Sequence, residues 1–255
     1  MTGYRVLLEK EAIEAWRTYR LGIVCGLFVV LGILSPVVTR YLPEIIRAFA
    51  PPGFQIDLPP LGVSDVIDQL LKNVIQFGAL AAVLITMGSV AAEKERGTAA
   101  LILAKPVSRV AFLWAKFVAL GMIFGLATIL AVVAAWLYTT LLFVAPPVLP
   151  WISMGIIIWL ATMVYVSITF LGSAALGSPL GAAAVGFAGL IGLSLASIIS
   201  TLNPWLPAGL VDVAKAVALE EASADLDPPR TIAMSLTLIA IALGLAWWRF
   251  RREEL

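Results

Sequence analysis

The sequence predicts an all-α integral membrane protein with six transmembrane helices, an N-terminal interface helix and both termini in the cytoplasm. Of the 255 residues, 61% are hydrophobic and only 13% are charged, whereas soluble domains carry roughly 25% charged residues. So little charge cannot cover a water-facing surface, which excludes a soluble globular domain. The third observation is a series of long uncharged runs, because a helix needs about 20 apolar residues to cross the hydrocarbon core.

Six runs without Asp, Glu, Lys or Arg come close to or exceed this length. They cover residues 21–39, 73–92, 117–144, 151–176, 182–202 and 231–248. Lipid leaves no partner for free backbone groups, and the runs are too long for the strands of a membrane barrel. We therefore expect one transmembrane domain over residues 1–255, built as a bundle of six helices.

The segments between the spans predict the orientation. Residues 1–20, 93–116 and 249–255 contain twelve Lys and Arg residues, whereas 40–72 and 203–230 contain five. Basic loops stay on the cytoplasmic side, so 40–72 and 203–230 are expected to be outer segments. The predicted location is the plasma (inner) membrane of a prokaryote, with several passes and both termini cytoplasmic. Tryptophans near the span ends fit an interfacial belt: Trp151, Trp205, Trp247 and Trp248.

Several function classes lack the residues they need. The chain has no histidine, and its single cysteine, Cys25, lies in an apolar run. Residues 117–211 hold no Asp, Glu, Lys or Arg, so a proton-driven carrier has no carboxylate to titrate at membrane depth. The net charge of +1 offers no basic stripe for nucleic acid. We expect no catalytic, metal-binding or cofactor-binding residues and no nucleic-acid partner.

Hydroxyl and glycine residues in the spans have two interpretations each. The hydroxyls could coordinate sodium in a carrier or could bond within the helix bundle, and the glycines could form a dimer face or let helices of one chain approach closely. The hydroxyls are Thr128, Thr139, Thr140, Thr162, Ser167 and Thr169. The glycines are Gly22 and Gly26, Gly121 and Gly125, Gly177 and Gly181, and Gly186, Gly189 and Gly192.

Residues 93–116 predict a short helix lying crosswise between the second and third spans. Gly97 can adopt a left-handed conformation that ends the preceding helix, and Thr98 can cap a new helix over 99–104. Pro106 ends that helix, and Ser108 can cap the third span. A rigid crosswise helix suits the docking of a soluble partner.

Charged residues surround this crosswise helix. We expect Glu93 and Glu95 to form ion pairs with a partner protein or with Arg96, Arg109 and the N-terminal helix. The alternative is that both glutamates are solvated residues that end the second span. Residues 4–20 predict an amphipathic helix along the membrane interface. On the outer side, Ser64 is expected to cap a helix leading into the second span, and 208–222 to form an amphipathic segment.

The order Glu93-x-Glu95-x-Gly97-Thr98, then Leu101, Leu103, Pro106, Ser108-Arg109 and Lys116, resembles the loop of ABC-2 type transporter permeases. Lys10-Glu11 with Arg17 resembles the interface helix of that family, and Asn203-Pro204 through Pro207 resembles its outer segment after the fifth span. The outer segment 40–72 is longer than in many members.

The resemblance implies the membrane subunit of an ABC transporter whose ATPase is a separate polypeptide. No G-x-x-x-x-G-K-[ST] phosphate loop occurs in this sequence. ATP and Mg²⁺ would bind the ATPase, expected in two copies, and a second permease, identical or related, would complete the assembly in the lipid. The residues implied to couple to the ATPase are Glu93, Glu95, Arg96, Gly97, Thr98, Leu101, Pro106, Ser108, Arg109, Lys10, Glu11 and Arg17.

The expected function is export of a hydrophobic, lipid-like or peptide substrate, driven by an ATPase that docks on residues 93–109. Two alternatives stay open. The chain could be a self-contained ion-coupled carrier or channel, or a membrane component of an assembly or maturation complex.

Overall fold

The computed structural model describes residues 2–49, 61–104, 107–198, 205–221 and 227–253. Every regular element over these residues is a helix. In chain order they are α1 (Thr2–Arg17), α2 (Arg20–Phe49), α3 (Val63–Thr86), α4 (Ala91–Glu95), α5 (Thr98–Leu103), α6 (Arg109–Leu142), α7 (Val148–Ala175), α8 (Pro179–Ala196), the 3₁₀ turn η2 (Pro207–Gly209), α9 (Leu210–Leu219) and α10 (Pro228–Arg251).

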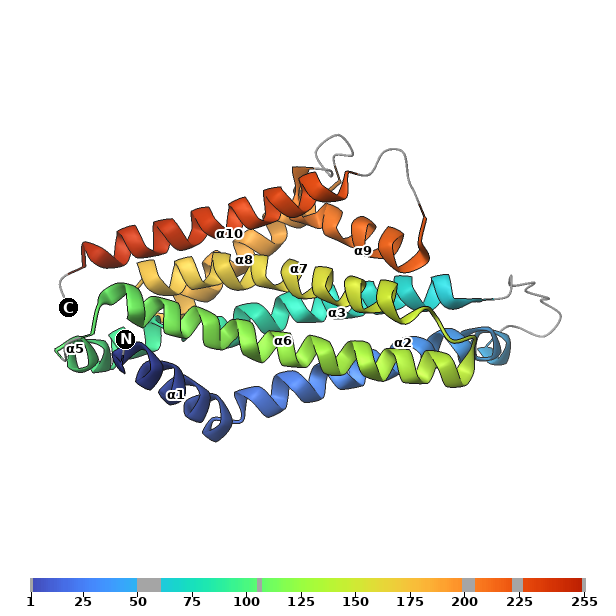
Figure 1. Ribbon diagram of the computed structural model, residues 1–255, viewed down its shortest axis with the longest axis horizontal. Helices are drawn as coiled ribbons and strands as arrows, with labels where there is room; N and C mark the ends of the chain where they lie inside the picture. Colours follow the sequence, from blue (N-terminus) through green and yellow to red (C-terminus); the bar gives the residue numbers. More distant parts are fainter. Residues whose placement is uncertain (1, 50–60, 105–106, 199–204, 222–226, 254–255) are drawn as a thin grey trace.

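Six helical segments are long and apolar enough to cross a membrane, counting α3 and α4 as one. The expected all-α class and number of spans are therefore confirmed. The start of α1 and the end of α10 lie at the same end of the bundle, beside α5 (Figure 1). We call this the α5 end of the molecule and the opposite end the α9 end.

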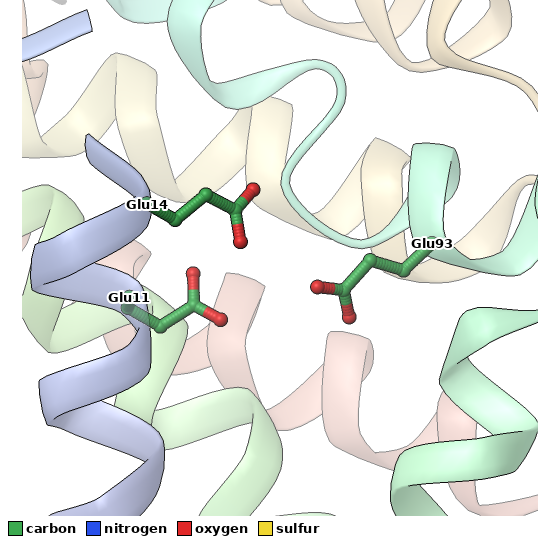
Figure 2. Close-up of side chains that lie close together, drawn as sticks. All are labelled: Glu11, Glu14 and Glu93. Carbon is green, nitrogen blue, oxygen red and sulfur yellow. The ribbon is translucent and has the colours of Figure 1, made fainter. Parts of the chain in front are cut away.

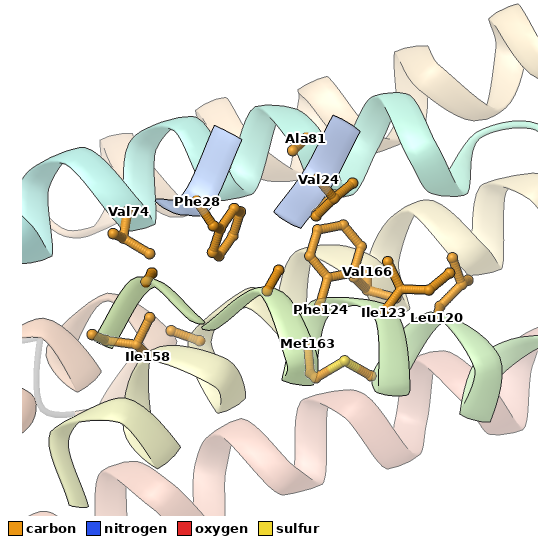
Figure 3. Close-up of a cluster of buried hydrophobic side chains, with 14 of the residues drawn as sticks. Val24, Phe28, Val74, Ala81, Leu120, Ile123, Phe124, Ile158, Met163 and Val166 are labelled. Atoms are coloured by element: carbon orange, nitrogen blue, oxygen red, sulfur yellow. The ribbon is translucent and has the colours of Figure 1, made fainter. Parts of the chain in front are cut away.

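Helix α7 is the centre of the bundle. The most apolar 18-residue stretch of α7 is 67% buried, whereas the corresponding stretches of α8 and α10 are 17% and 22% buried. Helix α7 also contacts α3, α6, α8, α9 and α10. Beside it, Phe28 of α2 packs on Phe124 of α6 with ring centroids 6.2 Å apart (Figure 3). The periphery of the bundle is therefore formed by α2, α8 and α10, whose apolar surface is left for lipid or for other chains.

Helix α2 continues past the predicted end of the first span. Residues 40–49, expected to begin an outer loop, form its last turns and include Pro43. A proline inside a helix removes one backbone hydrogen bond and crowds the preceding turn, but helices of membrane proteins tolerate it where neighbouring groups satisfy the freed backbone. The prolines from 51 to 60 lie outside the described residues.

Glycines allow α2 to approach α6 closely and α8 to approach α7 closely. Most of these glycines do not belong to the predicted pairs of glycines spaced four residues apart. A Cβ at Gly32 of α2 would overlap the carbonyl oxygen of Ala131 on α6. Gly186 and Gly189 of α8 would likewise overlap Thr169 and Ile168 of α7. Four of the other expected glycines have open space where a Cβ would lie: Gly22, Gly26, Gly177 and Gly192.

Of two details expected on the outer side, the cap by Ser64 is wrong and the amphipathic segment within 208–222 is present. Gly62, rather than Ser64, is the N-cap of α3, and its N–H donates to the Asp65 carboxylate at 2.8 Å. Asp65 sits three residues after the cap, where its side chain can reach back, whereas Ser64 is already inside the first turn. The amphipathic segment is α9, which packs against α3 and α7, with Lys215 paired to Asp68 at 2.8 Å.

The polar side chains of the spans mostly form hydrogen bonds within their own helices. The six span hydroxyls each donate to a carbonyl three or four residues earlier on the same helix. Trp151 does not join an interfacial belt, because it is only 2% exposed and its Nε1 donates to the Val132 carbonyl at 3.0 Å. Close packing of α7 on α6 buries this ring.

Candidate functional site

The candidate site is the connection between α3 and α6 at the α5 end, and it begins at a break in the third helix. Residues 87–90 form a turn between α3 and α4. Ser173 of α7 bridges this turn, since its Oγ accepts from the N–H groups of Val90 and Ala91 at 3.0 Å and donates to the Met87 carbonyl at 2.8 Å. A neighbouring helix thus supplies the cap that α4 lacks and fixes its direction.

The turn between α4 and α5 depends on Gly97. Its φ of 70° is in the left-handed region, as expected, and suits a residue without a Cβ. The expected cap by Thr98 is wrong, because its Oγ1 instead donates back to the Glu93 carbonyl at 3.1 Å. With Gly97 at the N-cap position, Thr98 is already the first residue of α5, and its hydroxyl can only reach backwards.

Helix α5 has one packed face and one open face. Ala99 is fully buried and Ile102 packs against the core, whereas Leu101 is 71% exposed. Leu101 is therefore exposed at the α5 end of the molecule, on a helix whose other face packs against the core.

Helix α4 is joined to α1 and α6 by a partly buried charge cluster, whose three carboxylates lie close together in Figure 2. We define this cluster as Lys10, Glu11, Glu14, Glu93 and Lys116. Lys116 is 2% exposed and its Nζ lies 2.9 Å from Glu11 and 3.0 Å from Glu93. Lys10 also pairs with Glu93, and lies 2.9 Å from Glu11 and 3.0 Å from Glu14. The predicted link between Glu93 and the N-terminal helix is present.

The carboxylates of this charge cluster are compensated by its own cations. Oxygens of Glu11, Glu14 and Glu93 lie within 4.8 Å of one another, a spacing that could hold a metal ion. Two ammonium groups already contact these oxygens, and the Arg20 guanidinium lies 3.9 Å from Glu14. Three positive charges thus match three negative ones, and the chemistry of the cluster is that of an ion-pair network.

The network shifts the pKa values of its α1 members. Burial by itself lowers the pKa of Lys10, but hydrogen bonds to Glu93 and Glu11 outweigh burial and raise it above its ordinary value. Burial raises the pKa of Glu14, but the hydrogen bond from Lys10 and the positive charges of Lys10, Lys116 and Arg20 together outweigh burial and lower the pKa below its ordinary value. Both groups are therefore held in their charged forms.

A second set of contacts joins α4 and α6 to the end of α10. Lys94 of α4 pairs with Glu253 at 2.6 Å and donates to the Ala174 carbonyl at the end of α7. Arg109, expected to pair with a glutamate, instead donates from Nη1 to the carbonyls of Phe250, Arg251 and Glu253 at 2.8–3.2 Å. The free carbonyls at a helix C-terminus attract a guanidinium. A displacement of α4 would therefore act on α1, α6, α7 and α10 together.

Comparison with known proteins assigns this arrangement to a family. Residues 64–255, which include α4, α5 and the contacts that join Lys94 and Arg109 to the end of α10, match the family described as ABC-2 family transporter protein. The chain belongs to the ABC-2 transporter family. It is also 28% identical over 259 residues to YxlG, an uncharacterized transmembrane protein of Bacillus subtilis (strain 168), over 97% of each chain. The sequence resemblance is thereby confirmed.

Membership of the ABC-2 family gives the chain a membrane transport role as a multi-pass protein. The family supplies the membrane component of the transporter, which associates with an ABC ATPase and is not the ATPase itself.

The residues that suggested the ABC-2 family fall into two groups in the structure. Lys10, Glu11, Glu93, Thr98 and Arg109 bond to other parts of the chain, and Ser108 caps α6 by accepting from Ala111 N–H at 3.1 Å, as expected. Outside this first group, the exposed residues are Glu95, Arg96, Gly97, Leu101 and Arg17. Pro106 lies outside the described residues. The first group fixes the conformation of the connection between α3 and α6 and bonds it to other helices, whereas the second group lies on the surface.

Four residues of this ABC-2 site were not expected from the sequence: Glu14, Lys94, Ser173 and Glu253. Glu14 lies one turn after Lys10 on the same helix, so the spacing alone could have suggested it. No sequence signal pairs Lys94 with Glu253 or brings Ser173 to the α4 turn, because helix packing decides both. Lys116 belonged to the recognised motif, yet its burial between two glutamates was not expected.

Proposed function

We propose that the chain is the permease subunit of an ATP-driven ABC exporter, whose separate ATPase docks on α5 and the adjoining residues 93–109. The observation that carries this proposal is the exposure of Leu101 on a short helix that is tied through α4 to four other helices. Two ATPase subunits bind ATP and Mg²⁺, and a second permease, identical or related, completes the transporter. The α5 end faces the cytoplasm of a prokaryotic cell.

The chemistry of the α5 surface favours a protein partner. Leu101 is exposed on α5, and the exposed charged residues Glu95 and Arg96 precede this helix directly in the chain; such charges would not lie in the hydrocarbon of a bilayer. A surface with both apolar and charged side chains has the composition of a protein interface, in which an apolar centre has a polar rim.

Motion of the ATPase subunits would reach the spans through the charge cluster. When they close on ATP, they push α5, and α4 transmits the push through Glu93 to α1 and α6 and through Lys94 to α7 and α10. Packed helices shift as rigid bodies rather than bending continuously. The spans then alternate between inward and outward exposure of the substrate path.

The apolar spans support the proposed substrate class. The hydroxyls that could have held sodium donate to carbonyls of their own helices, which weakens the rival function of a self-contained ion-coupled carrier or channel. A hydrophobic, lipid-like or peptide substrate matches a path lined by these apolar spans. A membrane component of an assembly or maturation complex is the other rival, and it also lacks a supporting contact.

Site-specific photocrosslinking tests the docking site. A photoreactive phenylalanine derivative replaces Leu101, or replaces Leu141 at the α9 end as a control, since these leucines are 71% and 77% exposed. We expect an ATPase adduct, identified by mass spectrometry, from position 101 and not from 141, and ATP hydrolysis by the copurified complex. An adduct from 141 alone, or no ATPase adduct from either position, would contradict the proposal.

A further inference from the structure

An apolar groove of about 630 Å³ runs between α6 and α10. Trp114 and Phe117 of α6 form one wall, Phe170 of α7 lies between the helices, and Leu236, Gly244 and Trp247 of α10 belong to the other wall. The groove has no part in the α4–α5 contacts and is separate from the charge cluster.

The groove lies beside a contact between α6 and α10 at the α5 end. There Phe112 and Phe250 stack with centroids 5.7 Å apart, and Arg109 bonds to the last carbonyls of α10. Beyond this point the two helices diverge, with α10 leaning away from α6 towards the α9 end (Figure 1). Phe170 of α7 is fully buried at the inner side of the gap, so the groove opens outward.

The length of the groove matches one leaflet of a bilayer. From Leu236 to Trp247 the α10 wall rises by about 16 Å at 1.5 Å per residue, roughly half of the ~30 Å hydrocarbon thickness. Trp114 and Trp247 are 49% and 39% exposed at the α5 end of the walls, where tryptophan is typical of the interface with lipid headgroups.

A cation lies at the mouth of the groove. Arg251 is one helical turn beyond Trp247, and its guanidinium lies 5.0 Å from the centre of the Trp247 ring. Arg252 lies 4.2 Å from the ring of Trp248, which does not line the groove. Arg251 is therefore placed to bind an anionic group at the end of an apolar chain that fills the groove.

We propose that this groove binds one anionic phospholipid, with an acyl chain between Trp114 and Gly244 and its phosphate on Arg251. Apolar walls of one-leaflet length, a tryptophan at the headgroup level and a guanidinium at the mouth together match this ligand. The bound chain fills the space where α6 and α10 diverge and so stabilises their relative position. The proposal is independent of ATPase docking.

Two pairs of variants of the full chain test the site. Gly244→Phe fills the groove, and Gly26→Phe is its control, because both glycines have open space within 4 Å of an added Cβ. Arg251→Gln removes the cation at the mouth, and Arg252→Gln removes the neighbouring cation. Native mass spectrometry of the detergent-purified proteins counts adducts with added phosphatidylglycerol and, separately, with phosphatidylcholine.

We expect the wild-type chain to retain one phosphatidylglycerol about fivefold better than phosphatidylcholine, the preference that one well-placed arginine supplies. Arg251→Gln should abolish the preference, Gly244→Phe should remove the retained lipid of both kinds, and the two controls should behave like the wild type. Equal loss of preference in Arg251→Gln and Arg252→Gln would show only diffuse attraction of lipid and would overturn the proposal. So would unchanged lipid retention in Gly244→Phe, whether or not its oligomeric state changes.

Discussion

Lys116 of α6 and Glu93 of α4 form an ion pair of 3.0 Å in which the lysine is only 2% exposed. The same ammonium lies 2.9 Å from Glu11 of α1, so one buried charge joins three helices. A buried ion pair contributes little relative to a well-packed apolar pair, but removing one partner leaves a buried charge without compensation.

Replacing Lys116 by methionine should therefore destabilise the protein by about 3–5 kcal/mol. The change keeps the apolar volume and leaves Glu11 and Glu93 with one cation fewer. Unfolding of the detergent-purified protein by increasing fractions of sodium dodecyl sulfate measures the difference. Lys72→Met is the control, because Lys72 is exposed on α3 and its loss should cost less than about 0.5 kcal/mol. Equal effects of the two changes would contradict the role of the charge cluster.

The pKa shifts of Lys10 and Glu14 predict a stability plateau at neutral pH. Lys10 has a raised pKa in the folded protein, so its contribution is complete below the ordinary lysine value of about 10.4 and is lost as the pH rises through the folded value. Glu14 has a lowered pKa, so its contribution is complete above the ordinary glutamate value of about 4.3 and is lost as the pH falls through the folded value.

Thermal unfolding between pH 3 and 11 checks this plateau. Glu14→Gln should flatten the acid side of the profile, because the substituted residue no longer binds a proton on unfolding. Glu9→Gln on the same helix, where Glu9 is 59% exposed, should leave the profile as in the wild type. The interpretation is wrong if the acid side is equally steep in wild type and Glu14→Gln.

Ser173→Ala should loosen the turn between α3 and α4. The change removes the acceptor for Val90 and Ala91 and the donor for Met87, and buried groups left without partners cost about 1–3 kcal/mol. Hydrogen exchange should accelerate in residues 87–91 and remain unchanged in the middle of α6. Ser153→Ala, at an exposed hydroxyl that only bonds within α7, should alter neither.

Gly97→Val should disturb the α4–α5 turn without unfolding the spans. A β-branched residue at φ 70° is strained by about 1–3 kcal/mol, whereas asparagine tolerates this region. If the ATPase docks on α5, the Gly97→Val change should separate ATP hydrolysis from transport in the copurified complex, and Gly97→Asn should keep them coupled. Transport at the wild-type rate in the valine variant would contradict the coupling role of α5.

Gly32→Ala should separate α2 from α6. Its added Cβ overlaps the Ala131 carbonyl, and such overpacking costs about 1–3 kcal/mol. Gly26→Ala on the same helix meets no atom within 4 Å, so the better helix propensity of alanine should stabilise it by up to about 1 kcal/mol. Opposite shifts of the unfolding midpoint are expected, and shifts of the same sign would refute the close contact.

Local features of the candidate site could be predicted because they depend on neighbouring residues. The left-handed turn at Gly97 needs only the missing Cβ, and the cap of α6 by Ser108 needs only the adjacent amides. The caps expected from Ser64 and Thr98 failed for an equally local reason, since each hydroxyl lies one or more residues inside the helix it was expected to begin.

By itself, the sequence determined that the chain is a six-span helical membrane protein and which segment carries the ABC-2 motif, because apolar length and turn residues act over a few positions. Only the tertiary structure decided that Lys116 is buried between Glu11 and Glu93, that Ser173 caps α4 and that Arg109 binds the end of α10. These contacts join residues far apart in the chain. They exist because helix packing brings the ends of α1, α4, α6, α7 and α10 to one place, which no local pattern encodes.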